Sequence, residues 1–518
     1  MKLSYELLKD KILGCYNGKN SGGVLGAPFE CKRGTFPVDY YTQKGIDNNP
    51  PPNDDLDLQL LWLNAVEEYG NKITPDILAD YWLTYIVPVW SEYGIGKSNL
   101  IRGINPPFSG KINNYYGQSN GAFIRSEIWA CLAPGNPEMA AHFAYLDACV
   151  DHYGEGIDAE IFFAATESAA FVESDTDKLV DIGLSYVAKD SRIKDVILFA
   201  KDCYKKGMPF EDARVALMTK YPGTFGVVFE TLEYIDELKK QGDYPIPSTG
   251  DDVVNTVGLT ILAWYYGEGD FEKTIKLATY CGEDADCTAA TIGALLGIVL
   301  GNKNLPEKWI KPIGNIINTV CISTTITKEN AIPKTTDELT DRILNAIPKF
   351  IDKTAYTLVP FEVTAKEGKD LYNLPYPRYL KWGSRDCGTY NFSVNELNAL
   401  KENSIFYTFD NFKAVITLDK APYIANGESI NLTVKISDNG MLRKQHYVNV
   451  TAYTGAGLKV DGAKSKTVAI HNSYEYDGVT TFTITAEELI KETNTVLIEM
   501  SMNGRHTYEV AKINLISK

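Results

Sequence analysis

Apolar residues recur at helical spacing through the first two thirds of the chain. Leu8, Ile12 and Cys15 lie on one face of a helix that this period predicts over residues 5–20. The glycine-rich sequence GGVLGAPFE that follows is expected to break this helix. Further segments with the same period succeed one another. The pattern therefore predicts an all-α unit over residues 1–355.

The period changes from helical spacing to strict alternation at about residue 405. Runs such as INLTVKIS, HYVNVTAY and TVLIEMSM place apolar side chains at every second position, which is typical of half-buried strands. About seven such runs predict a small all-β, immunoglobulin-like sandwich over residues 405–518. It carries no acid cluster, so we expect it to contact a partner or a second subunit. Residues 356–404, rich in aromatics, are predicted to be a packed linker.

The most informative stretch for chemistry is CGEDADCTAATIGALLGIVLG. Asp284 and Asp286 stand one residue apart, ahead of a run of small residues that predicts a helix from near Thr288. The dipole at a helix start favours ionised carboxylates, and carboxylate oxygens suit a hard divalent cation. Simple capping of the helix is the alternative interpretation, although one acid would suffice for it.

A second acid pair at another predicted helix start favours the metal site. In the sequence PPNDDLDLQLLW, prolines block a helix upstream, Asn53 is a good N-cap, and apolar residues follow at helical spacing. Asp54 and Asp55 are therefore placed in a first helical turn. Because two acid pairs at two helix entrances suit one shared metal centre, we expect them to lie close together in space.

Three motifs, in this order along the chain, resemble those of the ADP-ribosylglycohydrolase family. Residues 18–30, GKNSGGVLGAPFE, resemble its G-x-x-x-G-D-x-x-G-x-P-x-E; NDDLD resembles its [ST]-D-D-T; and GEDADCTAATIGALLG resembles its G-G-D-x-D-[ST]. The resemblance covers about residues 8–350. It implies an all-α hydrolase with two Mg²⁺ sites, or Mn²⁺ in their place. The implied reaction is cleavage of the N- or O-glycosidic bond of ADP-ribosylated or related ribosyl substrates.

The resemblance also implies roles for residues at the matched positions. Glu30 and Asp55 would be catalytic, with Glu30 as general acid/base or as the group that positions the water. The implied metal ligands are Asn53, Asp54, Asp55, Asp284, Asp286 and Cys287.

Three positions depart from the family pattern. Leu56 replaces a threonine and cannot ligate, Gly23 replaces an aspartate, and Cys287 replaces a serine or threonine. Because sulfur is a poor ligand for Mg²⁺, we expect one metal site to be weak or changed. The alternative is that Cys287 turns into the helix core as a small apolar residue.

Several polar turns supply weaker candidates for substrate binding. Residues 88–120 are rich in Gly, Asn, Pro and Tyr and are expected to be a long loop that walls a pocket. Tyr115 and Tyr116 would then stack on a base, or merely pin the loop to the core. Three more polar residues are candidates for contact with a substrate. His152 and Glu155 lie in a polar turn, and Asn255 lies near the start of another predicted helix.

Composition narrows the function classes. The net charge of −16 argues against nonspecific binding to nucleic acid or to an anionic membrane. Nine scattered cysteines, together with a start that lacks the apolar core of a signal peptide, favour a cytoplasmic protein with reduced thiols. Two other functions stay open: a non-catalytic binder of ADP-ribose or a sugar, and a carbohydrate hydrolase that uses two carboxylates without metal.

Overall fold

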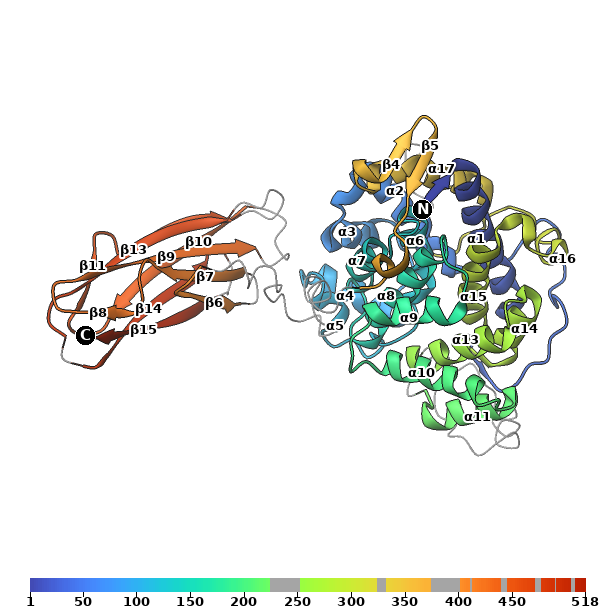
Figure 1. The fold of residues 1–518 in the computed structure, drawn as a ribbon, viewed down its shortest axis with the longest axis horizontal. Helices are drawn as coiled ribbons and strands as arrows, with labels where there is room; N and C mark the ends of the chain where they lie inside the picture. Colours follow the sequence, from blue (N-terminus) through green and yellow to red (C-terminus); the bar gives the residue numbers. More distant parts are fainter. Residues whose placement is uncertain are drawn as a thin grey trace. The chain divides into compact units, whose positions relative to one another are not determined.

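The computed structural model divides the chain into two compact units, Met1–Gly388 and Thr389–Lys518 (Figure 1). Part of the predicted linker lies outside the described residues. The structure describes residues 1–223, 252–323, 332–373, 401–409, 412–438, 445–470, 477–489, 491–504 and 508–518.

The first unit is helical, as predicted, and one continuous hydrophobic core joins its helices. The described helices are α1 (Tyr5–Gly26), α2 (Asp54–Tyr69), α3 (Pro75–Tyr85), α4 (Ser91–Ile101), α5 (Phe108–Lys111), α6 (Glu127–Leu132), α7 (Pro137–Ala148), α8 (Glu155–Ala169), α9 (Thr176–Tyr186), α10 (Arg192–Lys205), α11 (Phe210–Lys220), α13 (Val253–Gly267), α14 (Phe271–Tyr280), α15 (Ala285–Leu300), α16 (Glu307–Ile310) and α17 (Thr336–Phe350).

Helices α1 and α15 run antiparallel and in contact along a line of glycines. Glycine recurs at every fourth position of α1 from Gly14 to Gly26. A Cβ at Gly18 would overlap the backbone oxygen of Gly293 on α15. The prediction that GGVLGAPFE breaks the first helix is therefore wrong, because α1 continues to Gly26 and its glycines serve a close helix contact. This contact sets the end of α1 against the start of α15.

The loop predicted between residues 88 and 120 contains helix α4 and the short helix α5. The prediction of one long loop is therefore wrong. Helix α4, with the sequence SEYGIGKSNLI, has poor intrinsic propensity. It is helical because Tyr93 and Leu100 are buried in the core, and tertiary packing outweighs local preference.

Two small sheets complete the first unit. Strand β1 (Lys2–Ser4) pairs with β5 (Phe361–Thr364), which pairs with β4 (Tyr356–Leu358), all antiparallel. The start of the predicted linker thus forms strands with the N-terminal residues. The second sheet is the short antiparallel pair of β2 (Lys32–Arg33) and β3 (Gly282–Glu283), which lies beside the acid motif.

The second unit is the predicted sandwich of two five-stranded sheets, with strand orders β12-β10-β14-β15-β8 and β11-β13-β9-β7-β6. Alternate side chains of both sheets enter one hydrophobic core, as Val448 and Val450 do on β10. The seven predicted runs correspond to β7, β9, β10 and β12 to β15. The strands are β6 (Ser404–Thr408), β7 (Phe412–Leu418), β8 (Tyr423–Ile424), β9 (Ser429–Asp438), β10 (His446–Thr454), β11 (Leu458–Asp461), β12 (Ser465–Ile470), β13 (Gly478–Ala486), β14 (Thr493–Met502) and β15 (Tyr508–Ser517).

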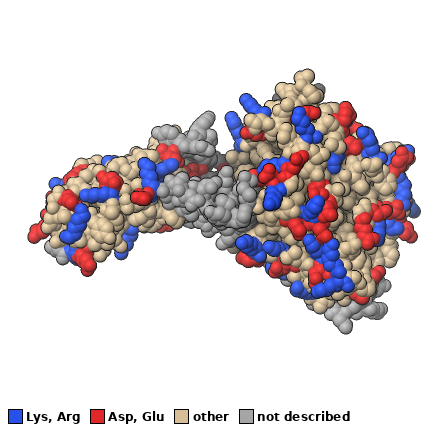
Figure 2. All heavy atoms as spheres, in the orientation of Figure 1, with Lys and Arg blue, Asp and Glu red and all other residues tan. Residues whose placement is uncertain are grey.

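The surface of the helical unit carries both signs of charge. Figure 2 shows acidic and basic side chains interspersed over the face in view. Ion pairs such as Lys205–Asp177, 2.6 Å apart, are partly exposed to water, and each contributes at most about 1 kcal/mol. The stability of this unit therefore comes from its core. Among the helices that the structure describes, none has the length and apolar character needed to cross a bilayer.

Candidate functional site

The starts of α2 and α15 meet and bring the two predicted acid pairs into one site. The Sγ atom of Cys287 donates to Oδ1 of Asp55 at 3.2 Å. Asn53 Nδ2 donates to Oδ2 of Asp286 at 3.4 Å, while Asn53 Oδ1 accepts the backbone N–H of Asp55 at 2.8 Å and caps α2. The acids are thus neighbours in space although they are far apart in the sequence.

Two groups of side chains in the described part of the chain are arranged so that each can hold an ion. One consists of Asp55, Asp286 and Cys287, and the other of Glu30, Asp284 and Asp286. Within each group, the ligand atoms lie within 4.8 Å of one another. Glu30 is exposed and the other members are buried. Asp286 belongs to both groups, so the two candidate positions for an ion are adjacent.

The local fold fixes Glu30 beside the acid motif. Gly26, four residues earlier, touches the backbone of Ala285 so closely that a Cβ would not fit. Arg33, three residues later, forms a bidentate pair with Glu283, with Nε–Oε1 and Nη2–Oε2 distances of 2.7 and 2.9 Å. Both side chains of this pair are fully buried. The segment that carries Glu30 is therefore held on both sides.

The buried carboxylates have unused acceptors and raised pKa values. Oδ2 of Asp55, Oδ1 of Asp284 and Oδ1 of Asp286 are buried without a hydrogen-bond partner. Burial raises the pKa of Asp55 to about 8 and that of Asp54 to about 6, and repulsion from Asp284 contributes to both. Burial and neighbouring acids hold the pKa of Asp286 well above its usual range. A divalent cation would relieve this desolvation and repulsion, so the donor set fits a metal.

Lys19 is a site residue that the sequence analysis missed. Its ammonium group is buried and donates to Oε1 of Glu127 and to the backbone oxygen of Ile124, both at 2.8 Å. Burial raises the pKa of Asp55, and the positive charge of Lys19 acts in the opposite direction and lowers it. In the sequence, Lys19 could have been noticed as a charged residue within a stretch of small residues.

A polar loop with the sequence QSN connects further predicted residues to the acids. Asn120, which was not predicted, donates to Oδ2 of Asp284 at 2.7 Å. Ser119 Oγ lies 3.0 Å from Nε2 of the buried His152, and Glu155 accepts a hydrogen bond from the same loop. His152 and Glu155 are therefore connected to Asp284 through this loop. Contact of either residue with a substrate stays a prediction.

The remaining candidates lie in two other places. Tyr115 is 65% exposed, and its ring packs edge-on against Tyr116 with centroids 5.2 Å apart. Stacking of these rings on a base stays a prediction. Asn255 is buried, and its Nδ2 lies 3.4 Å from Oε2 of Glu283. It therefore supports the ion pair that Glu283 makes with Arg33, behind the acid motif.

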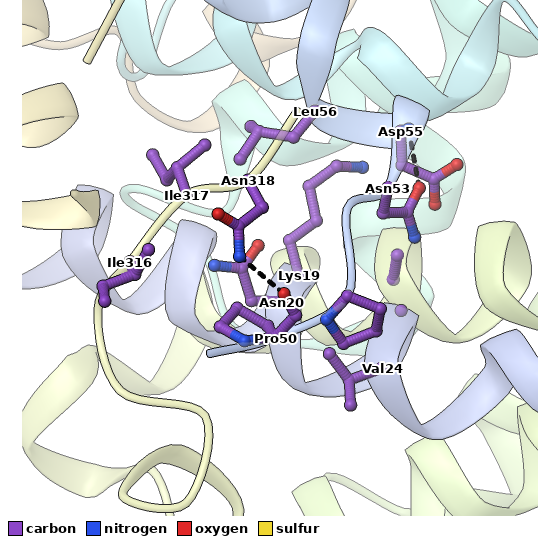
Figure 3. Close-up of a pocket in the computed structure, with 13 residues that line it drawn as sticks. Lys19, Asn20, Val24, Pro50, Asn53, Asp55, Leu56, Ile316, Ile317 and Asn318 are labelled. Carbon is purple, nitrogen blue, oxygen red and sulfur yellow. Dashed lines mark hydrogen bonds between the residues drawn. The ribbon is translucent and has the colours of Figure 1, made fainter. Parts of the chain in front are cut away.

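A small cavity adjoins the candidate metal centre (Figure 3). Its volume is about 30 Å³, which is room for roughly two waters, and Asn53, Asp55 and Leu56 are among its lining residues. A larger cavity of about 740 Å³ shares part of this lining. Asn318 Nδ2 donates to the backbone oxygen of Pro50 at 2.7 Å and joins two of the segments that line both. Water can therefore be held directly beside Asp55.

The helical part of the chain matches the model of one protein family. The family model of the ADP-ribosylglycohydrolases matches residues 4–349, well over half of the 518-residue chain. A solved "ADP-ribosylglycohydrolase-related protein complex" is 18% identical, with 67% of this chain and 100% of that chain covered and a TM-score of 0.43. A FixG-related protein from Vibrio parahaemolyticus is 10% identical over 21% of this chain and 98% of that chain, with a TM-score of 0.17.

No curated protein matches the chain. The assignment therefore rests on the family model, whose matched range includes Glu30, the acids of both helix entrances and Cys287. The chain belongs to the ADP-ribosylglycohydrolase family.

Proposed function

We propose that this protein is a divalent-metal-dependent hydrolase of the N- or O-glycosidic bond in ADP-ribosylated or related ribosyl substrates. Mg²⁺ is the expected ion, with Mn²⁺ as the alternative. One observation carries the proposal: buried carboxylates from two helix entrances converge with unpaired oxygens, and Glu30 stands exposed beside them. Membership of a family of glycoside hydrolases supports the same class of reaction.

The residues of the site divide the work between holding ions and moving a proton. Asp55, Asp284 and Asp286 would hold the ions, which when bound supply Lewis acidity toward ribose hydroxyls and water. Glu30, the exposed member, would take a proton from the attacking water or give one to the leaving group. Asn120 keeps one oxygen of Asp284 directed by a hydrogen bond, which leaves the other oxygen for an ion.

Release of ADP-ribose from ADP-ribosylated peptides tests the proposal. The full chain is incubated with peptides carrying ADP-ribose on arginine or on serine, with Mg²⁺, with Mn²⁺, or with a chelator. We expect release that requires the metal. Binding of ADP-ribose without any release would identify a non-catalytic binder. Cleavage of a sugar substrate that survives the chelator would identify a metal-free, two-carboxylate glycosidase. Either result would overturn the proposal.

Glu30→Gln is expected to lower the rate of ADP-ribose release by about 10²–10⁴-fold, because the amide cannot transfer the proton. The increase in melting temperature on adding Mg²⁺ should largely persist, since three buried carboxylates remain. Glu6→Gln, an exposed acid in the first turn of α1, is the matched control. A Glu30→Gln variant that is as active as the wild type would exclude Glu30 as the general acid/base.

Asn120→Ala is expected to weaken Mg²⁺ or Mn²⁺ affinity by about 10–100-fold while the fold is retained, because Asp284 loses the donor that orients it. Titration calorimetry of the metal-free protein measures the affinity. Asn304→Ala, at an exposed position, serves as the control. Equal affinity in the Asn120→Ala variant and the wild type would show that Asp284 needs no such support.

A further inference from the structure

The thiol of Cys287 faces the carboxylates. It donates to Oδ1 of Asp55 at 3.2 Å and belongs to the group in which Asp286 also offers an oxygen. Cys287 lies in the first turn of α15, which meets the start of α2, and only 7% of its surface is exposed. Cys287 is thus a buried residue at the edge of the hydrophobic core, and its thiol is directed toward the carboxylate of Asp55.

We infer that Asp55, Asp286 and Cys287 form a site for a borderline divalent ion of the Zn²⁺ class, distinct in preference from the all-oxygen group around Glu30. The inference deepens the proposed function and rests on it for the role of the bound ions. The centre would then be mixed, with Mg²⁺ or Mn²⁺ held by Asp284 and Asp286 beside Glu30, and the softer ion held on the side of Cys287.

The donor atoms explain this preference. A thiolate is a soft ligand that favours Zn²⁺ and related ions, whereas Mg²⁺ prefers an octahedral set of hard oxygens. Two carboxylates and one thiolate also leave a fourth tetrahedral position open, as in catalytic zinc sites. Leu56, whose side chain is buried and lines the adjoining cavity, offers no oxygen there to complete a hard site.

The distance between Cys287 and Asp55 suits this ion. In a tetrahedral site with Zn–O and Zn–S bonds of about 2.0 and 2.3 Å, the oxygen and sulfur ligands stand about 3.5 Å apart. The Sγ atom of Cys287 is already 3.2 Å from Oδ1 of Asp55. On binding, the S–H bond breaks, its proton passes to the solvent, and sulfur forms the metal bond in place of the hydrogen bond.

A second, independent observation points to a ligand at the same place. Oδ2 of Asp55 and Oδ1 of Asp286 are buried and lack a hydrogen-bond partner, although both side chains belong to the group that includes the thiol. Asn53 Nδ2 contacts the other oxygen of Asp286 at 3.4 Å and so helps to orient this carboxylate. These side chains therefore converge, and each carboxylate keeps one buried oxygen that accepts no hydrogen bond from the described residues.

Cobalt spectroscopy tests the inference independently of activity. The metal-free full chain is titrated with Co²⁺, and a near-ultraviolet sulfur-to-cobalt charge-transfer band is expected. The band should disappear in Cys287→Ser and in Cys287→Ala. It should persist in Cys203→Ser, because the charged neighbours of that buried thiol on α10 are Asp202, Lys206 and Lys220 and not the acids of the site. No band in the wild type, or loss of the band in Cys203→Ser alone, would overturn the inference.

Competition between ions supplies the second measurement. The preference for Zn²⁺ over Mg²⁺, taken as the ratio of their dissociation constants, should fall about tenfold or more in Cys287→Ser. An unchanged ratio would overturn the inference. A cobalt–sulfur band without ADP-ribose release under any ion would leave this site standing and refute the proposed function. Mg²⁺-dependent release without the band would do the reverse.

Discussion

Asp286→Ala is expected to abolish Mg²⁺ binding and ADP-ribose release while the helical unit stays folded. Asp286 is the carboxylate common to both groups of candidate ligands, so its loss removes a ligand from each. Without metal, the variant should be as stable as the wild type or slightly more stable. The reason is that the substitution removes a buried acid whose neighbours, Glu30 and Asp284, repel its charge.

Thermal melts with and without Mg²⁺ separate these effects. An ion that binds only the folded state adds about 2.7 kcal/mol of stability at a hundred times its dissociation constant. The wild type should show this gain and the Asp286→Ala variant should not. Asp212→Ala removes an exposed acid from the first turn of α11 and should keep the gain. An undiminished Mg²⁺ shift in Asp286→Ala would exclude this residue from the metal centre.

Features with local signals were predictable from the sequence. Asn53 was predicted to cap α2, and its side chain accepts the N–H of Asp55. The strands of the sandwich were predicted because apolar residues at every second position place their side chains on one face of a strand, which is then buried. The start of α15 was predicted near Thr288 and lies three residues earlier, at Ala285. These features depend on neighbouring residues only.

Features that depend on a distant partner were not predictable in the same way. The pairing of β2 with β3 and the hydrogen bond from Asn120 to Asp284 join segments far apart in the chain. Gly23 and Asn53 are a second example of a relation between distant residues that the sequence alone does not show. They are two separate departures from the family pattern, yet a Cβ at Gly23 would stand 2.9 Å from Asn53 Nδ2. The asparagine occupies space that a side chain at residue 23 would need.

The glycines of α1 were the most ambiguous signal, because glycine either ends a helix or lets another backbone approach. The partner decides between the two, and it lies on α15. Gly22→Ala should therefore be strongly destabilising, since the new Cβ would overlap the backbone oxygen of Ala289. The overlapping atom belongs to the helix backbone and cannot rotate away, so α1 and α15 must move apart. We expect this to lower the free energy of unfolding by about 1–3 kcal/mol.

Gly23→Ala, one residue along the same helix, is the matched control. Its Cβ would meet the end of the Asn53 side chain, which can move, and it would stand at ordinary contact distance, 3.6 Å, from Cβ of Ala290. Alanine also improves helix propensity by about 0.8–1.0 kcal/mol. Calorimetric melts should place Gly22→Ala well below the wild type and Gly23→Ala near it. Separation of the helices also moves Glu30 away from Asp286, so Gly22→Ala should lose Mg²⁺ affinity. Equal melting temperatures for the two variants would show that the glycine contact does not hold α1 against α15.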